Sequence, residues 1–123
     1  MGFVITYEVD DSVDRQLSRR ELAKLLGCHF NTLRKDELLI KTWVTDAAKY
    51  YRSDDPNKLE SIELTPYLIW LLVQVRNLRN KGHGTDAIAR RLFFDQPDHY
   101  SEKGFKAYVE QSQNRKARSA AVA

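Results

Sequence analysis

The chain has little of the chemistry on which most enzymes and metalloproteins depend. It has a single cysteine, Cys28, which we expect to lie in the protein core. The three histidines, at positions 29, 83 and 99, are far apart and lack a ligand-like spacing with this cysteine. No glycine-rich phosphate loop, nucleophile motif or paired-carboxylate signature is present. We therefore expect no enzyme, no metal site and no cofactor.

Long apolar runs are also missing. No stretch reaches the roughly 18 apolar residues that a membrane span needs, and charged residues come too early for a signal peptide. We therefore expect a cytoplasmic protein that does not contact a membrane. With 123 residues, the chain can form one domain, or one domain and an appendage. Its net charge of +3 is mild for a nucleic-acid-binding protein and does not decide the question.

The most informative segment begins with a helix start signal at Ser18. Ser18 followed by Glu21 forms a capping box, in which the two side chains satisfy amide groups that a helix start leaves without partners. Leu22, Leu25 and Leu26 then fall on one helical face. Gly27 is placed to end this helix, since glycine reaches the left-handed conformation without a side-chain clash.

A second short helix is predicted directly after this glycine. Phe30 and Leu33 are three residues apart and can pack back on the first helix. The polar and cationic residues between and after them stay outside: His29, Asn31, Thr32, Arg34 and Lys35. The pattern as a whole predicts a helix-turn-helix, a shape that fits the major groove of DNA. A helical hairpin without any DNA-binding role is the alternative.

The predicted DNA contacts follow from this arrangement. Basic residues crowd the first third of the chain, where they can meet phosphates: Arg15, Arg19, Arg20, Lys24, Arg34, Lys35 and Lys41. We expect Arg19 and Arg20 to contact phosphate at the start of the first helix. Base edges or nearby phosphates are assigned to Asn31, Thr32, Arg34 and Lys35, because asparagine suits adenine, arginine suits guanine and threonine can meet a thymine methyl.

The helix-turn-helix resembles the reading unit of MerR-type winged helix-turn-helix regulators. The resemblance is carried by Glu21-Leu22-Ala23, Gly27-Cys28-His29, Thr32-Leu33-Arg34 and Glu37, and by a second block over residues 75–88 that contains Leu78-Arg79, Gly82 and Ile88. It implies a two-stranded wing between the two blocks, at residues 40–64. Lys35 and Asp36 depart from the family, which has paired tyrosines there, and His29 replaces a serine that would cap the helix better. About 30 residues follow the second block, which implies a small member without an effector-binding domain and without a small-molecule effector.

Two segments are predicted to form a small sheet beside the reading unit. Residues 3–9 are rich in β-branched and aromatic side chains, and residues 59–64 alternate between apolar and polar, so these segments can pair as strands. Between them, residues 42–52 favour a helix. Lys49 and Arg52 are interpreted as phosphate contacts in or near the wing. Tyrosines packed in a core beside solvated basic neighbours are an equally good interpretation of this segment.

Three further helices are predicted in the rest of the chain. Thr65-Pro66 starts a helix that runs to about Lys81, and its apolar residues lie on more than one side, so part of it is interpreted as an interface. Thr85 caps the next helix, and Ser101 caps the last one. The basic segment from Gln113 onward is expected to fray.

The predicted fold is mostly α with a small β component, a winged helix-turn-helix with additional helices. Its DNA-binding domain spans residues 1–94 with the reading unit at 18–37, residues 95–112 form a C-terminal helix with a possible dimerisation role, and residues 113–123 form a flexible basic tail. The predicted function is a sequence-specific transcriptional regulator, a repressor that binds double-stranded DNA as a homodimer at a dyad-symmetric operator. The alternatives are an excisionase-like architectural DNA-binding protein of a mobile element, or a protein-interaction adaptor on a helix-turn-helix scaffold.

Overall fold

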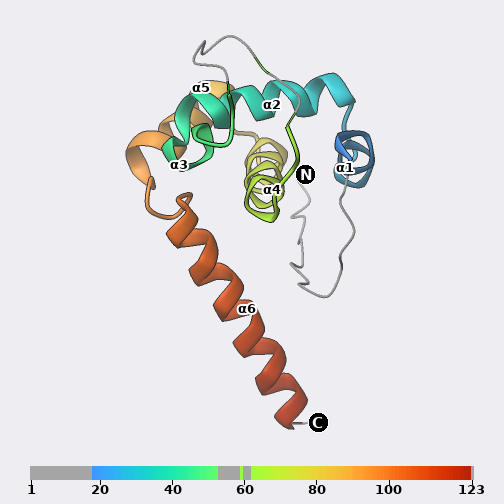
Figure 1. Cartoon of the computed structure of the whole chain (residues 1–123), viewed down its shortest axis with the longest axis vertical. Coiled ribbons are helices and arrows are strands. Elements are labelled where there is room, and N and C mark those ends of the chain that lie inside the picture. The colour runs from blue at the N-terminus through green and yellow to red at the C-terminus, as the bar shows by residue number, and fades with distance from the viewer. Residues whose placement is uncertain (1–17, 53–58, 60–61, 123) are drawn as a thin grey trace.

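The computed structural model describes residues 18–52, 59 and 62–122, and these residues form a helical assembly (Figure 1). Helix α2 lies across the central helix α4, with α1 at one end of α2 and α3 at the other. A π-helix, η1, directly continues α5. In chain order the elements are α1 (Arg19–Leu26), α2 (Phe30–Trp43), α3 (Thr45–Ala48), α4 (Pro66–Asn80), α5 (Thr85–Arg90), η1 (Arg91–Asp95) and α6 (Glu102–Val122).

The predicted helix-turn-helix is present as α1, a turn at Gly27, and α2. The Ser18 hydroxyl accepts a hydrogen bond from the Glu21 amide at 3.1 Å, which confirms the serine half of the predicted capping box, and the same hydroxyl donates to the Glu21 carboxylate at 3.1 Å. Gly27 is left-handed, with φ +69°, and its amide donates to the Lys24 carbonyl, while the Cys28 amide donates to the Ala23 carbonyl. This pair of hydrogen bonds satisfies carbonyls that the helix end leaves open and turns the chain into α2.

Helix α2 is longer than the sequence pattern predicted. It has 14 residues and ends only where Val44 adopts an extended conformation. The single helix expected at residues 42–52 is instead the last turn of α2 followed by the short α3. The reason is burial, because Leu33 and Ile40 fall on one stripe of α2 that packs into the core, and Val44 directly after the helix is buried as well.

The predicted wing is wrong for the part of the chain that the structure describes. Residues 40–48, which the wing was to include, are helical apart from Val44, and residues 59 and 62–64 belong to no strand. Leu64 is buried, and Leu59 and Ile62 pack against the core from irregular chain. Packing on the helices therefore overrides the local strand pattern. The other expected strand, at residues 3–9, lies outside the described residues, as do residues 53–58 and 60–61.

Helix α4 is the centre of the core. Thr65 caps it by accepting a hydrogen bond from the Leu68 amide, and Pro66 occupies its first position, both as predicted. Its apolar residues on all sides are buried by the surrounding helices: Tyr67, Leu68, Ile69, Trp70, Leu71, Leu72, Val73, Val75 and Leu78. The apolar excess of this helix is therefore used inside the chain. The apolar residues of α4 therefore give no support to the predicted interface on this helix.

The C-terminal helix α6 extends away from the other helices (Figure 1). The Ser101 hydroxyl caps it by accepting from the Gly104 amide at 3.1 Å. Phe105 and Tyr108 anchor its first turns on Trp70, with ring centroids 5.4 and 5.8 Å from the indole. The helix continues to Val122, where we expected fraying from Gln113. The composition allows this, because residues 113–122 are rich in alanine, lysine, arginine and glutamine, which favour helices. None of the described helices is both long and apolar enough to cross a membrane.

Candidate nucleic-acid interface

The exposed side of the helix-turn-helix carries the polar residues that the sequence pattern placed there. Asn31 and Lys35 are one helical turn apart on α2 and both are exposed, and Thr32 beside them is half-buried. His29 is also exposed and makes no side-chain hydrogen bond to the start of α2, as expected for a poor cap. The amide groups of this helix start therefore have no side-chain cap, and their dipole favours an anion.

Two cations on α1 lie at the same exposed turn region. The Arg20 guanidinium lies over the Phe30 ring, 4.8 Å from its centroid, which places a charge of α1 beside the first turn of α2. Lys24, one turn further along α1, is exposed. The residues that we group as the reading surface are thus Arg20, Lys24, His29, Asn31, Thr32 and Lys35.

Arg19 and Arg34, by contrast, are engaged with a buried carboxylate. Glu37 is 1% exposed, and Arg19 donates to its two oxygens at 2.6 and 2.8 Å. Arg34 donates to the same carboxylate at 2.7 Å. The hydrogen bonds that Arg19 donates to Glu37 also raise the pKa of Arg19. Arg19 therefore holds α1 to α2, whereas Arg34 lies on α2 itself and pairs with Glu37 within that helix; the two arginine side chains are 14% and 19% exposed. In the structure both arginines contact Glu37, whereas the sequence predicted that they contact phosphates and base edges.

Tyr51 completes the ring of donors around Glu37. Its hydroxyl, just after α3, donates to the Glu37 carboxylate at 2.9 Å. Burial and the negative charge of Glu37 raise the pKa of Tyr51 well above its usual value. Lys41, a predicted phosphate contact, is buried, with its ammonium group 5.8 Å from the centre of the Tyr51 ring. Lys41 therefore does not belong to the exposed reading surface.

A second buried carboxylate ties α2 to α4. Asp36 accepts from Arg76 and from Arg79, each at 2.7 Å. Asp36 is one of the two positions at which the chain departs from the paired tyrosines of the MerR-type regulators, and it makes a helix-to-helix ion pair here. Arg79 also donates to the Thr85 hydroxyl, so Thr85 does not cap α5 as we expected, and Gly84 takes the capping position.

Lys49 and Arg52 do not join the reading surface. Lys49 pairs with Glu102 of α6 at 2.6 Å, which raises the pKa of the lysine and lowers that of the glutamate. Arg52 is exposed and follows α3. Both residues lie beyond the C-terminal end of α2, whereas the reading surface lies at its N-terminal end (Figure 1). The structure therefore separates them from the other predicted DNA contacts.

The two buried carboxylates are the important residues that the sequence analysis missed. Asp36 and Glu37 were treated as a departure from the family and as a family match, not as partners of arginines. Their spacing from Leu33 and Ile40 places them on the buried stripe once α2 is taken to Trp43. Because a buried carboxylate needs cationic partners, this spacing was the signal that could have revealed them.

Other chemistry is sparse in the part of the chain that the structure describes. Cys28 is partly buried against the core, and burial raises the pKa of its thiol. Within the described ranges, no group of three or more histidine, cysteine, aspartate or glutamate side chains is placed to hold a metal ion.

Comparisons with known protein families, with curated proteins and with solved structures find no match to this chain. The site must therefore be interpreted from its own geometry and charge.

Proposed function

We propose that the chain binds double-stranded DNA through the reading surface of its helix-turn-helix and acts as a transcriptional regulator. One observation carries the proposal. The two acidic residues of α2 that could repel phosphate, Asp36 and Glu37, are buried and each is paired with two arginines. The exposed turn region keeps the cations Arg20, Lys24 and Lys35. A rigid helix pair with a basic, hydrogen-bonding exposed edge is what the major groove accepts.

The proposed contacts divide into two kinds. Arg20, Lys24 and the uncapped amides at the start of α2 would bind phosphates and set the register of the protein on the duplex. Asn31 and Lys35 would reach base edges, because they share one exposed face of the first turns of α2. The side-chain amide of asparagine matches the donor and acceptor of adenine in the major groove, and lysine matches the acceptors of guanine.

Repression at a dyad-symmetric operator remains part of this proposal. A bound helix-turn-helix can block a promoter by occupancy alone, so repression requires nothing beyond tight and specific binding. A protein with this function must lie in the compartment that holds the DNA, and the sequence predicts that this compartment is the cytoplasm. It includes no wing.

The experiment that tests the proposal is selection of DNA duplexes from a random-sequence pool by the full chain. We expect an enriched motif with adenine or guanine at the positions next to α2. The Asn31→Ala variant should bind the recovered motif about 5- to 150-fold more weakly, since a good base contact contributes about 1–3 kcal/mol. Lys103→Ala, which changes an exposed residue on α6, serves as the control and should bind as the wild type does. Failure to enrich any motif would overturn the proposed sequence specificity.

A further inference from the structure

The described surface has an unusual aromatic patch on η1. Among the described residues, the exposed large apolar side chains are Leu25, Phe93 and Phe94. Phe93 and Phe94 are adjacent, with their rings 5.0 Å apart, and Trp43 at the end of α2 lies 5.8 Å from Phe93. The patch thus joins the C-terminal end of α2 to a π-helical turn. Such turns are rare and are found frequently at functional sites.

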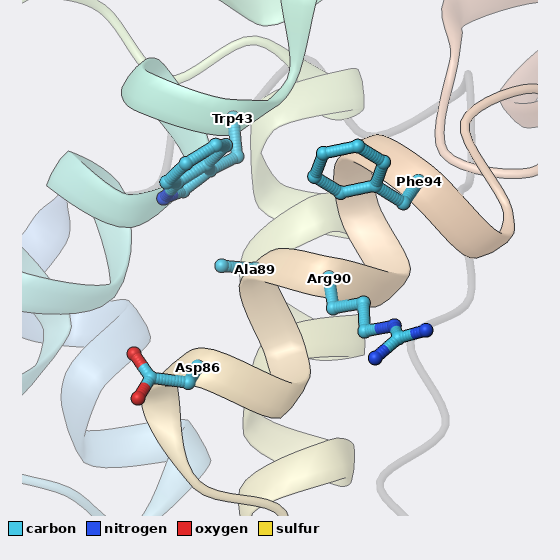
Figure 2. A pocket seen from close by; sticks show the side chains of 5 residues that line it. All are labelled: Trp43, Asp86, Ala89, Arg90 and Phe94. Carbon is cyan, nitrogen blue, oxygen red and sulfur yellow. The ribbon is translucent and has the colours of Figure 1, made fainter.

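A cavity opens beside these rings. It has a volume of about 450 Å³ and is lined by Trp43, Asp86, Ala89, Arg90 and Phe94 (Figure 2). Phe94 forms part of its wall and yet is 69% exposed. The same surface therefore offers both a protruding aromatic ring and a mostly apolar hollow. Exposed apolar area of this kind marks an interaction site.

The charged residues at the cavity have opposite signs and point in opposite directions. Figure 2 shows the Asp86 carboxylate on one side of Ala89 and the Arg90 guanidinium on the other. Arg90 has only a long contact of 3.6 Å with Asp95, between two well-exposed side chains. Such an exposed pair contributes little, so Arg90 can bind another carboxylate.

We propose that this patch is the interface with a second copy of the chain. In a two-fold interface the same surface meets itself, so it must be self-complementary. Here Phe94 of each copy enters the hollow of the other, and Asp86 of each copy faces Arg90 of the other. A partner of one charge would satisfy only one of these two residues. The small side chain of Ala89 between them allows a close approach.

The position of the patch also suits DNA binding, and this step rests on the proposed function. The reading surface and the patch lie at opposite ends of α2, whose 14 residues span about 20 Å. When two copies join at the patch with their α2 helices pointing outward, their reading ends are roughly 40 Å apart. Half-sites one helical turn apart are separated by about 34 Å. The two surfaces therefore do not compete for one partner, and one dimer presents two reading surfaces at a separation of the order of a helical turn of DNA.

The test is sedimentation velocity of the full chain without DNA, from low micromolar to several hundred micromolar concentration. We expect the mass to rise from the 14.3 kDa of the monomer towards twice that value. Phe94→Ser should raise the concentration needed for dimers at least about tenfold. Leu25→Ser is the matched control, because Leu25 is 68% exposed and lies on α1 away from the patch. It should leave the dimer unchanged.

A charge exchange tests the contact between Asp86 and Arg90 across the two copies. Asp86→Lys alone and Arg90→Glu alone should each weaken the dimer, because each homodimer then brings like charges together. An equimolar mixture of the two variants should dimerise again, since every contact in the mixed dimer joins opposite charges. A monomer at all concentrations, or equal effects of Phe94→Ser and Leu25→Ser, would overturn the inference. Because no DNA is present, such a failure would leave the proposed DNA binding standing and would remove only a dimer formed before DNA is bound.

Discussion

Arg19 and Glu37 join the two helices of the helix-turn-helix through a pair of hydrogen bonds of 2.8 and 2.6 Å. Arg19 is the first residue of α1, and Glu37 lies in the middle of α2. A two-point contact between a guanidinium and a carboxylate fixes orientation as well as distance. This pair therefore sets how α2 is presented relative to α1, and with it the shape of the reading surface.

Replacing Glu37 by glutamine should destabilise the protein strongly. The substitution keeps the size of the side chain but removes the charge that Arg19 and Arg34 share. Breaking a buried ion pair from one side costs about 3–5 kcal/mol, and we expect the lower end because both arginines retain some contact with water. Urea denaturation followed by tryptophan fluorescence measures this. Glu110→Gln, on the exposed side of α6, should change the free energy of unfolding by less than about 0.5 kcal/mol. Similar values for both variants would refute the role of Glu37.

The neighbours Arg34 and Lys35 should behave differently when each is changed to alanine. Arg34→Ala should lower the free energy of unfolding by about 1–3 kcal/mol, because Arg34 donates to buried Glu37. Lys35→Ala should leave stability within about 0.5 kcal/mol of the wild type, because Lys35 is exposed. DNA affinity measured by fluorescence anisotropy should fall for Lys35→Ala even though the fold is intact. Unchanged binding by this variant would remove Lys35 from the reading surface.

Stability should decline in alkaline solution in a way that depends on Tyr51. Burial and the charge of Glu37 raise the pKa of Tyr51 in the folded state, whereas an unfolded tyrosine ionises near about pH 10. The stabilisation is therefore complete below about pH 10 and is lost as the pH rises above it, by up to about 1.4 kcal/mol per pH unit. Burial also raises the pKa of Tyr67, which acts in the same direction.

Urea denaturation between about pH 7 and 11 measures this effect. Tyr51→Phe should be less stable than the wild type at neutral pH by about 1.5–3 kcal/mol, because a hydrogen bond to a charged group is lost. Its stability should then fall less steeply above pH 10, since one titrating group is gone. Parallel curves for the two proteins would show that Tyr51 ionises normally in the fold.

Two glycines should respond to alanine for different reasons. Gly27 has φ +69°, and an added Cβ would meet nothing within 4 Å. Gly27→Ala should thus cost only the backbone strain of about 1–2 kcal/mol. At Gly104 the added Cβ would overlap the carbonyl oxygens of Asp98 and His99, so the backbone must move.

We expect Gly104→Ala to cost more than Gly27→Ala, because it shifts the start of α6 and loosens Phe105 from Trp70. Thermal unfolding monitored by circular dichroism compares the two variants, and tryptophan fluorescence reports the movement near Trp70. A Gly104→Ala variant with the stability and spectrum of the wild type would contradict the close approach of these segments.

Local signals predicted several helix starts well, but they predicted helix ends and tertiary contacts poorly. The caps at Ser18 and Thr65 and the turn at Gly27 were predictable, since each depends on residues within one helical turn. The wing was predicted wrongly, because α3 follows α2 directly and the buried residues Val44 and Ala47 join a core cluster that brings distant parts of the chain together.

For the predicted site residues as well, local patterns predicted exposure, whereas contacts between residues far apart in the sequence were missed. Arg20, Asn31 and Lys35 are exposed as the helical periodicity indicated. Arg19 was interpreted as a phosphate contact because its partner Glu37 lies 18 positions away, and only the folded chain brings them together. Periodicity thus predicted the exposed polar residues but wrongly grouped Leu25, which is 68% exposed, with the apolar face of α1. It also could not show which cations have a buried partner.

The salt dependence of DNA affinity tests the central claim most directly. The measurement is fluorescence anisotropy of a labelled duplex titrated with the full chain at several salt concentrations. The wild type should bind more weakly as the salt concentration rises. The logarithm of its affinity should fall linearly with the logarithm of the salt concentration, with a slope of about −0.9 for each phosphate contact. Arg20→Ala combined with Lys24→Ala, which removes the two proposed phosphate-binding side chains, should reduce this slope by about 2, whereas Lys103→Ala combined with Lys106→Ala on α6 should leave it unchanged. No binding at low salt, or equal slopes for both double variants, would contradict DNA binding through this surface.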